Sequence, residues 1–535
     1  MLPDRTDPDP PAIPAGGTTL RRRDFLRGSL AAGGGLVAGA VGLGRTRAFA
    51  AIPDRPALTH GVQSGDAGAR SAVVWARADR PSRMLVEVSA TPSFRRSSLI
   101  EGPVLTPDSD LTGKVRLRGL RPGREVFYRV SLEDLDNPFV TSAPVDGFLR
   151  TASRRHGQDV SFVWGADIAG QGYGINPDVG GYRIFRAMEA LEPDFFLCSG
   201  DTVYADGPIP ESIALPDGRV WRNLTTPEKS KVADTLAEFR GQYAYNLTDE
   251  NLRRFAARVP QINQWDDHEV VNHWYPGEVL PDADPHAEKR VDVLAGRAKQ
   301  AFFEWLPITP GAERIGRIHR KLERGPLLDL FILDMRTFKD PNNGNLHADP
   351  ARGLLGAEQR EWLKRELVAS RATWKVIAND LPLGLLVPDG PEAWEGVAQG
   401  EDGPPLGREL EFDEVLTHAH RNGVTGIVLL TADVHYAAAH HYSPDRAPGR
   451  DFTPFWEFVA GPLNAGGFGP NELDGTFGPE AVFVAAPPRQ VASPLEGSQF
   501  FGEVKIDGGS ERMTVSLRDI DGRVLHRVEL DAERP

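Results

Sequence analysis

The sequence has little cysteine, a shortage of basic residues and no long apolar run after its first 50 residues. Its single cysteine, Cys198, excludes an internal disulfide and any cysteine-rich zinc or iron–sulfur site. With 61 basic against 75 acidic residues, the net charge is −14. A nucleic-acid scaffold, which would need a basic surface, is therefore not expected. No segment beyond residue 50 reaches membrane-spanning length, so we expect no stable membrane anchor in the mature protein.

The length and composition of the chain indicate a globular protein of more than one domain. The chain has 535 residues, of which 40% are hydrophobic and 25% charged, and this length suits two or three domains. The 56 glycines and 44 prolines predict a fold rich in loops and turns.

The first 50 residues have the three regions of an export signal. Twin arginines in the stretch 21–27 are followed by an apolar, glycine-rich run over 28–44 and by a small-residue site at 48–50. The run is too short and too rich in glycine for a transmembrane helix. This pattern is typical of a Tat signal peptide over residues 1–50, with cleavage near Ala51. It predicts the Tat translocase as a partner and a periplasmic or secreted location.

Two kinds of domain follow the leader. Residues 51–152 contain only strand patterns at the spacing of a small β-sandwich, similar to fibronectin type III modules. Residues 155–535 alternate strands with helices, which predicts an α/β domain. Its tail, from Phe500 to Leu530, returns to the alternation of β-hairpins.

Polar side chains follow the strands expected in the α/β domain. Five predicted strands, at 160–164, 195–198, 261–265, 374–378 and 426–430, run into carboxylate, imidazole, phenol or amide groups. Because ligands bind at the carboxyl ends of strands in open α/β sheets, we expect these groups to share one cleft. Such a cleft suits a polynuclear metal site made mainly of oxygen donors.

The order of these blocks resembles that of calcineurin-like metallophosphoesterases. The stretches GDTVYAD (200–206), WDDHEVVNHW (265–274), LDMRTF (333–338) and TADVH (431–435), behind a sandwich domain and a Tat leader, are similar to the alkaline phosphatase D family. The resemblance covers essentially the mature chain. It implies a catalytic domain of two packed mixed sheets flanked by helices.

The resemblance also implies roles for individual residues. The implied metal ligands are Asp167, Asp201, Tyr204, Asp267, Asp433 and His435, with Asp201 bridging two ions. Tyr204 is at the position of the phenolate that marks a ferric site. The implied catalytic residues are His268, which would assist the leaving group, Arg336 and Asn379. Arg336 would hold a phosphate oxygen, although an internal salt bridge with Asp334 or another carboxylate is an equal alternative. Glu269 and Asn272 are candidates for supporting contacts.

The metals implied are Ca²⁺ and Fe³⁺, because carboxylate at Asp433 replaces a usual histidine and hardens the site. The family's best-known members have a cysteine after the first strand of this domain. Residues 164–167 are Trp-Gly-Ala-Asp, so another divalent metal alone remains an alternative. Cys198 lies within a strand and is expected to be an inert core residue.

The function implied is that of an alkaline phosphatase D-like hydrolase of phosphomonoesters, with phosphodiesters as a second candidate substrate class. It would release phosphate by attack of a metal-activated hydroxide. No serine or cysteine nucleophile motif argues for a covalent route. Two alternatives stay open: a narrower phosphodiesterase or nucleotidase, and a non-catalytic cation- or surface-binding protein on the same fold.

Overall fold

A computed structural model describes residues 54–312, 316–349, 353–401, 403–449 and 451–533, and the backbone of a two-residue strand, β1 (Leu20–Arg21). The predicted leader over residues 1–50 otherwise lies outside the described residues. A search of the described part of the chain found no helix with the length and apolar character needed to span a membrane.

The N-terminal part forms the predicted β-sandwich. Its strands are β2 (Leu58–Gly65), β3 (Ser71–Ala78), β4 (Ser82–Ser89), β5 (Ser97–Leu105), β6 (Thr112–Arg118), β7 (Glu125–Asp134) and β8 (Val145–Arg150), with a 3-10 turn at Pro107–Ser109. One sheet has the order β1-β5-β4-β7-β8, and β2, β3 and β6 face it. Inward side chains such as Val74, Val86 and Leu132 fill the space between the sheets.

The second sheet of the sandwich does not end at the domain boundary. It continues into a nine-stranded sheet of order β23-β22-β21-β9-β10-β13-β2-β3-β6, through the parallel pairing of Gly65 with Gln261. A Cβ at Gly65 would lie 2.4 Å from the Pro307 carbonyl oxygen and 2.7 Å from that of Gln261, so only glycine permits this approach. The Tyr128 hydroxyl also donates to the Ala257 carbonyl. The sandwich is therefore joined to the rest of the chain by backbone pairing as well as by the linker.

The α/β part contains two large sheets. The strands that complete the nine-stranded sheet are β9 (Val160–Gly165), β10 (Phe195–Cys198), β13 (Gln261–Asn263), β21 (Phe500–Ile506), β22 (Met513–Asp519) and β23 (Val524–Leu530). A seven-stranded sheet has the order β14-β15-β16-β17-β19-β18-β20. Its strands are β14 (Arg320–Glu323), β15 (Leu328–Ile332), β16 (Trp374–Ala378), β17 (Ile427–Thr431), β18 (Ala437–Tyr442), β19 (Phe455–Val459) and β20 (Pro479–Ala485). A small hairpin, β11 (Ser212–Ala214) and β12 (Val220–Arg222), stands apart.

The two-residue period of the strands decides which layer each side chain joins. On β9, Phe162 and Trp164 face the second sheet, whereas Val163 faces the helices. On β10, Phe195 and Leu197 likewise face the second sheet, and Cys198 lies on the helix side. Strands buried on both faces are therefore almost continuously apolar.

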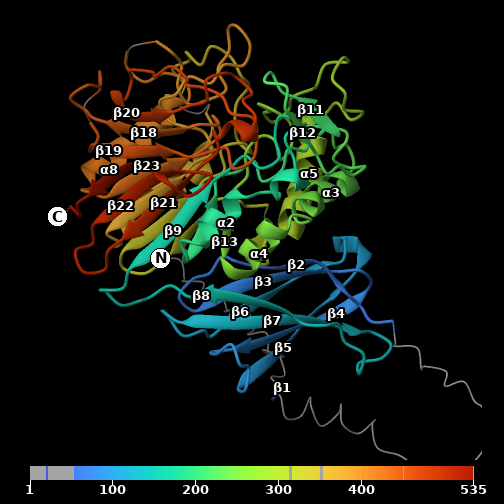
Figure 1. Cartoon of the computed structure of the whole chain (residues 1–535). Coiled ribbons are helices and arrows are strands. Elements are labelled where there is room, and N and C mark those ends of the chain that lie inside the picture. The colour runs from blue at the N-terminus through green and yellow to red at the C-terminus, as the bar shows by residue number, and fades with distance from the viewer. Residues whose placement is uncertain are drawn as a thin grey trace, which may run out of the picture.

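Helices cover the outer faces of both sheets (Figure 1). They are α2 (Ile184–Glu189), α3 (Leu236–Asn246), α4 (Glu250–Arg258), α5 (Val291–Trp305), α7 (Gly356–Ala369) and α8 (Glu409–Arg421). The helices α2 to α5 pack on the nine-stranded sheet, and α7 and α8 pack on the seven-stranded sheet. The predicted architecture of two packed mixed sheets flanked by helices, behind a β-sandwich, is confirmed.

Candidate metal centre

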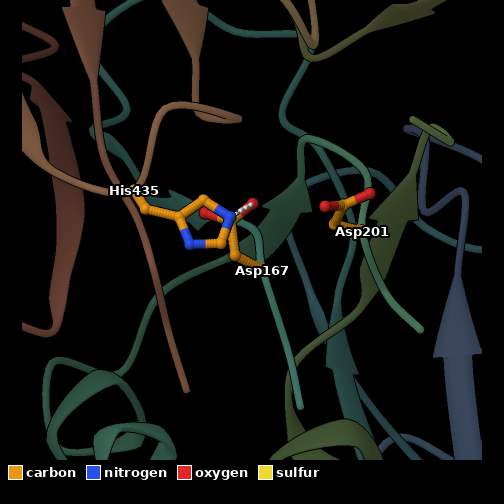
Figure 2. Close-up of side chains that lie close together, drawn as sticks. All are labelled: Asp167, Asp201 and His435. Carbon is orange, nitrogen blue, oxygen red and sulfur yellow. Dashed lines mark ion pairs between the residues drawn. The ribbon is translucent and has the colours of Figure 1, made fainter. Parts of the chain in front are cut away.

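The carboxyl ends of strands from both sheets meet at one place. Asp167 follows β9 and Asp201 follows the adjacent parallel strand β10, whereas His435 follows β17 of the other sheet. One ligand atom from each lies within 4.8 Å of the others (Figure 2). In this group, His435 Nε2 lies 3.7 Å from Asp167 Oδ1.

Three further groups of candidate ligands connect to the first. Asp201 belongs also to a group with Asp267 and His268. Asp267 in turn belongs to a group with Asp266 and Asp433 and to one with His273 and Glu395. Five of the six ligands predicted from the sequence therefore lie in one chain of adjoining groups. The sixth, Tyr204, is adjacent: its hydroxyl lies 2.9 Å from His435 Nε2.

The backbone at these ligands is strained. Asp167, Asp201, Asp433 and His435 have φ angles of 67°, 45°, 63° and 60°, in the left-handed region that non-glycine residues rarely adopt. Each such residue costs on the order of 1–3 kcal/mol, and such strain is typical of functional sites. The loops therefore orient the candidate ligand side chains at the expense of local backbone stability.

The centre has an excess of buried negative charge. Burial raises the pKa values of Asp167, Asp201 and Asp433 well above the ordinary range of a carboxyl group, and neighbouring carboxylates raise them further. Neither carboxylate oxygen of Asp167 has a hydrogen-bond partner among the described residues, although the side chain is fully buried. A buried carboxylate without partners is costly unless a cation compensates it. These residues therefore fit a bound metal ion.

The imidazole of His435 is oriented for ligation. Its Nδ1–H donates to the Gly466 carbonyl oxygen at 2.5 Å, which leaves the lone pair of Nε2 directed at Asp167 and Tyr204. Burial lowers the pKa of His435 to about 4, so the ring is neutral at ordinary pH. A carbonyl acceptor behind the ring is the usual support of a metal-bound histidine.

Glu269 connects the loops that carry the ligands. Its carboxylate accepts backbone N–H groups from Asp201 at 3.2 Å, Thr202 at 2.7 Å and Asp266 at 2.8 Å. The loops approach so closely that a Cβ at Gly200 would lie 2.4 Å from that of Asp266. Glu269 thus supports the ligands and is not itself directed at the centre.

His268 stands beside the centre with a carboxylate behind it. Its Nδ1 lies 2.8 Å from Asp206 Oδ1, and Nε2 points toward Asp267. Burial disfavours the charged imidazole, but the carboxylates of Asp206, Asp267 and Asp201 outweigh this effect and raise the pKa of His268 well above its ordinary value. Sequence reasoning missed Asp206, although it lies in the GDTVYAD stretch, because only the fold brings it to His268.

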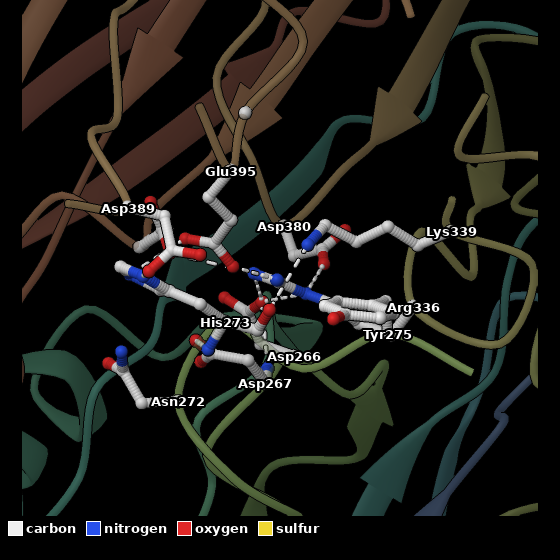
Figure 3. A network of polar contacts seen from close by, with 12 residues as sticks. Asp266, Asp267, Asn272, His273, Tyr275, Arg336, Lys339, Asp380, Asp389 and Glu395 are labelled. Atoms are coloured by element: carbon white, nitrogen blue, oxygen red, sulfur yellow. Dashed lines mark hydrogen bonds and ion pairs between the residues drawn. The ribbon is translucent and has the colours of Figure 1, made fainter. Parts of the chain in front are cut away.

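Arg336 and Asn379 lie behind the cleft. The Arg336 guanidinium is fully buried and forms ion pairs with Asp266, Asp380 and Glu395 (Figure 3). Of the two alternatives raised by the sequence, the structure shows the internal salt bridge, with carboxylates other than Asp334. Asn379 is also fully buried, and its side-chain amide donates to the Leu381 carbonyl.

The same network reaches the cleft through His273, which sequence reasoning also missed. His273 Nε2 lies 2.9 Å from Glu395 Oε2, and Nδ1 lies 3.3 Å from Asp389 Oδ1 (Figure 3). Its backbone N–H donates to the candidate ligand Asp267 at 2.6 Å. Glu395, which contacts both His273 and Arg336, follows no strand, so its position carries no sequence signal.

The candidate metal ligands line a cleft with a volume of about 680 Å³. Its polar lining includes Asp201, Asp267, His268, Asp433 and His435. The apolar part of the lining, which we call the apolar wall, includes Leu386, Val387, Trp394, Phe468 and Pro470. The cleft is much larger than a phosphate group and has room for an organic substituent.

Comparisons with known proteins agree with this geometry. A family model described as "PhoD-like phosphatase" matches residues 162–517, and one described as "PhoD-like phosphatase, N-terminal domain" matches residues 44–153. Alkaline phosphatase D of Bacillus subtilis is 26% identical over 492 residues, which cover 84% of this chain and 77% of the relative. The solved structure of PhoD superposes with a TM-score of 0.66 at 21% identity and covers 90% of both chains. A purple acid phosphatase from yellow lupin has a TM-score of 0.52 at 11% identity, over 90% of this chain and 75% of its own.

Proposed function

The chain belongs to the PhoD-like phosphatase family and is a phosphoric ester hydrolase, and on this premise we propose that it hydrolyses phosphate esters with the help of two or more metal ions. The observation that carries the metal dependence is Asp167, a buried carboxylate with no hydrogen-bond partner among the described residues, in the candidate ligand group that also contains Asp201 and His435. Metal ions bound there would neutralise the phosphate oxygens and lower the pKa of water.

The candidate ligands fall into two sets according to their position. Asp167, Tyr204 and His435 would hold one ion, and Asp201 would be shared with a second ion near Asp267 and Asp433. The donors are mainly oxygen atoms, which suits Ca²⁺, and the Tyr204 phenol suits Fe³⁺. This is the metal pair that the family resemblance implies.

His268 is the proposed general acid. Its Nδ1–H is held by Asp206 at 2.8 Å, so its Nε2–H points toward the cleft, where it can donate a proton to the leaving oxygen. Asp206 keeps the ring in this orientation and in its charged form. The apolar wall at Trp394 and Phe468 would contact the organic part of the ester.

The twin-arginine pattern supports export, and we propose a periplasmic or secreted location. The substrates are then phosphate esters outside the cytoplasm. Their hydrolysis would release inorganic phosphate there.

The test compares a chromogenic phosphomonoester with a chromogenic phosphodiester before and after chelation, alongside elemental analysis of the purified protein. We expect turnover that chelation abolishes and that metal restores, with two or more metal ions per chain. Retention of full activity by a metal-free protein would contradict the mechanism, and metal binding without turnover of either ester would favour the cation-binding alternative. The ratio of the two rates distinguishes a phosphatase from a phosphodiesterase.

A further inference from the structure

A second cleft lies on the β-sandwich, far from the metal ligands. It has a volume of about 1300 Å³ and lies between the β4–β5 connection and the β6–β7 turn. Arg95 and Arg96 line it from the first segment, and Arg121 and Arg124 line it from the second. We call this cleft, with its four arginines, the arginine groove. All four are exposed.

Among the described residues, the four guanidinium groups have no ion-pair partner. None of them forms an ion pair or a side-chain hydrogen bond with a described residue, in a chain that has more acidic than basic residues. The fifth arginine of the cleft, Arg150, differs because Asp194 at 3.0 Å and Glu125 at 3.6 Å neutralise it. The cleft therefore keeps about four uncompensated positive charges within a strongly acidic protein. Like charges held together without a counter-charge repel one another, so this arrangement suits an anionic ligand.

The positive charge continues into the linker. Gly123, in the β6–β7 turn, donates to the carbonyl of Ala152, which places the start of the linker beside the groove. Arg154 and Arg155 follow at once, both exposed. The basic surface is therefore elongated and not confined to a single anion-sized spot.

The residues that line the groove favour some classes of anionic ligand over others. No aromatic residue lines the groove, so the stacking platform typical of single-stranded nucleic-acid binding is missing from it. No exposed large apolar side chain lines it either, and a concave surface fits a flat bilayer poorly. What remains is a cleft of guanidinium groups, whose planar donor pairs match phosphate oxygens.

We propose that the arginine groove binds a linear polymer that carries phosphate groups along its length. The choice of phosphate over other anions rests on the proposed function, whereas the binding of a polyanion does not. Gln158, at the edge of the groove, comes just before β9, and the ligand Asp167 comes just after it. The six residues of β9 span about 20 Å at ~3.3 Å each, so the groove is a separate site and not part of the catalytic cleft. A polymer held there would raise the local concentration of phosphate groups near that cleft.

The test is a fluorescence-anisotropy titration of end-labelled, long-chain inorganic polyphosphate with the purified protein. The test variant is R95E/R96E/R121E/R124E. The matched control, R55E/R183E/R371E/R527E, reverses four other exposed arginines that also have no ion pair with a described residue. Both sets change the net charge equally. Excess inorganic phosphate is added throughout to fill any site for a single phosphate, including the catalytic cleft.

We expect the groove variant to bind polyphosphate about 100-fold more weakly than the native protein, and the control variant only slightly more weakly. The slope of log K against log salt should fall by about 3, because four phosphate contacts are lost. No turnover is measured, so a failure of the proposed hydrolase function would not alter this result.

Three outcomes would overturn the proposal. Equal weakening in both variants would show that general charge, and not the groove, attracts the polymer. Equal binding of poly-glutamate would refute the assignment to phosphate. Preferential binding to phosphatidylglycerol vesicles, lost in the groove variant, would show that the partner is a membrane.

Discussion

Replacement of Asp201 by Asn should change the stability of the protein in opposite directions with and without metal. Asp201 is fully buried and belongs to two adjoining groups of candidate ligands. Burial raises its pKa well above the ordinary range, so the folded, metal-free protein is stabilised by neutralising this side chain. Asparagine provides that neutrality permanently, and it tolerates the φ angle of 45° found at this position. Its side-chain oxygen can still accept the backbone N–H of His268, which lies 3.2 Å from Asp201 Oδ1.

The magnitude follows from the cost of an uncompensated buried charge, about 3–5 kcal/mol. Unfolding entropy of about 2.1 cal/mol/K per residue makes 1 kcal/mol worth about 1 °C for a chain of this length. The chelated Asp201→Asn variant should therefore melt about 3 °C above the chelated native protein at pH 8. The sign follows from linkage: a carboxyl group whose pKa is raised by folding destabilises the fold above its unfolded pKa, and in full above its folded pKa, and asparagine removes this penalty. With metal added the order of the melting temperatures should reverse, because the variant has lost the charge that two ions would share under the proposed function.

The assay is thermal unfolding by circular dichroism with and without chelator, together with metal content and turnover. Activity should fall more than about 100-fold, which is the upper end of the loss caused by a supporting residue. Asp217→Asn controls for the loss of one negative charge at an exposed position. A chelated Asp201→Asn protein that melts below the chelated native protein, or a variant that keeps its metal and its rate, would refute the reasoning.

Three further predictions concern neighbouring features. If iron is bound, Tyr204→Phe should abolish the visible charge-transfer band of the protein while the far-UV signal stays, and a colourless, fully active native protein without iron would refute the ferric assignment. Asp206→Asn removes the carboxylate that contributes most to raising the pKa of His268, so the loss of kcat/KM at high pH should begin at lower pH. An unchanged pH profile would show that His268 is not the acid. Replacement of Arg22 and Arg23 by Lys should leave precursor in the cytoplasm, as immunoblots of cell fractions would show, and unchanged export would exclude the Tat route.

The strand pattern allowed much of this architecture to be predicted, because the information is local. The alternation within Phe195–Cys198 places Cys198 on the helix side, where it is buried, and burial raises its pKa to about 12. This agrees with the expected inert core residue. Acidic and imidazole groups directly after strands were also visible in the sequence, since parallel strands carry their carboxyl ends to a common edge.

The contacts that sequence reasoning left open depend on long-range pairing. For Arg336 the sequence offered a hold on phosphate, or a salt bridge with Asp334 or another carboxylate, and could not select among them. The Asp334 carboxylate accepts from the side chains of Trp265 and Thr337. The carboxylates that pair with the Arg336 guanidinium lie elsewhere in the chain, at Asp266, Asp380, Glu395 and Asp433. Likewise, nothing in the local pattern indicated that the sandwich continues into the catalytic sheet through Gly65, because one short parallel pairing leaves no periodic signal.

The candidate metal centre shows why strand-end acids are better evidence of function than of fold. Asp167 and Asp201 adopt strained backbone conformations, are removed from water and repel one another, so each lowers the stability of the metal-free fold. A fold could avoid all three costs with a glycine or asparagine in each loop. The Glu269 carboxylate accepts three backbone N–H groups and so holds these loops in their unfavourable conformations. The preferences of the local backbone are overridden where the proposed chemistry needs these side chains, and a bound cation would offset the cost.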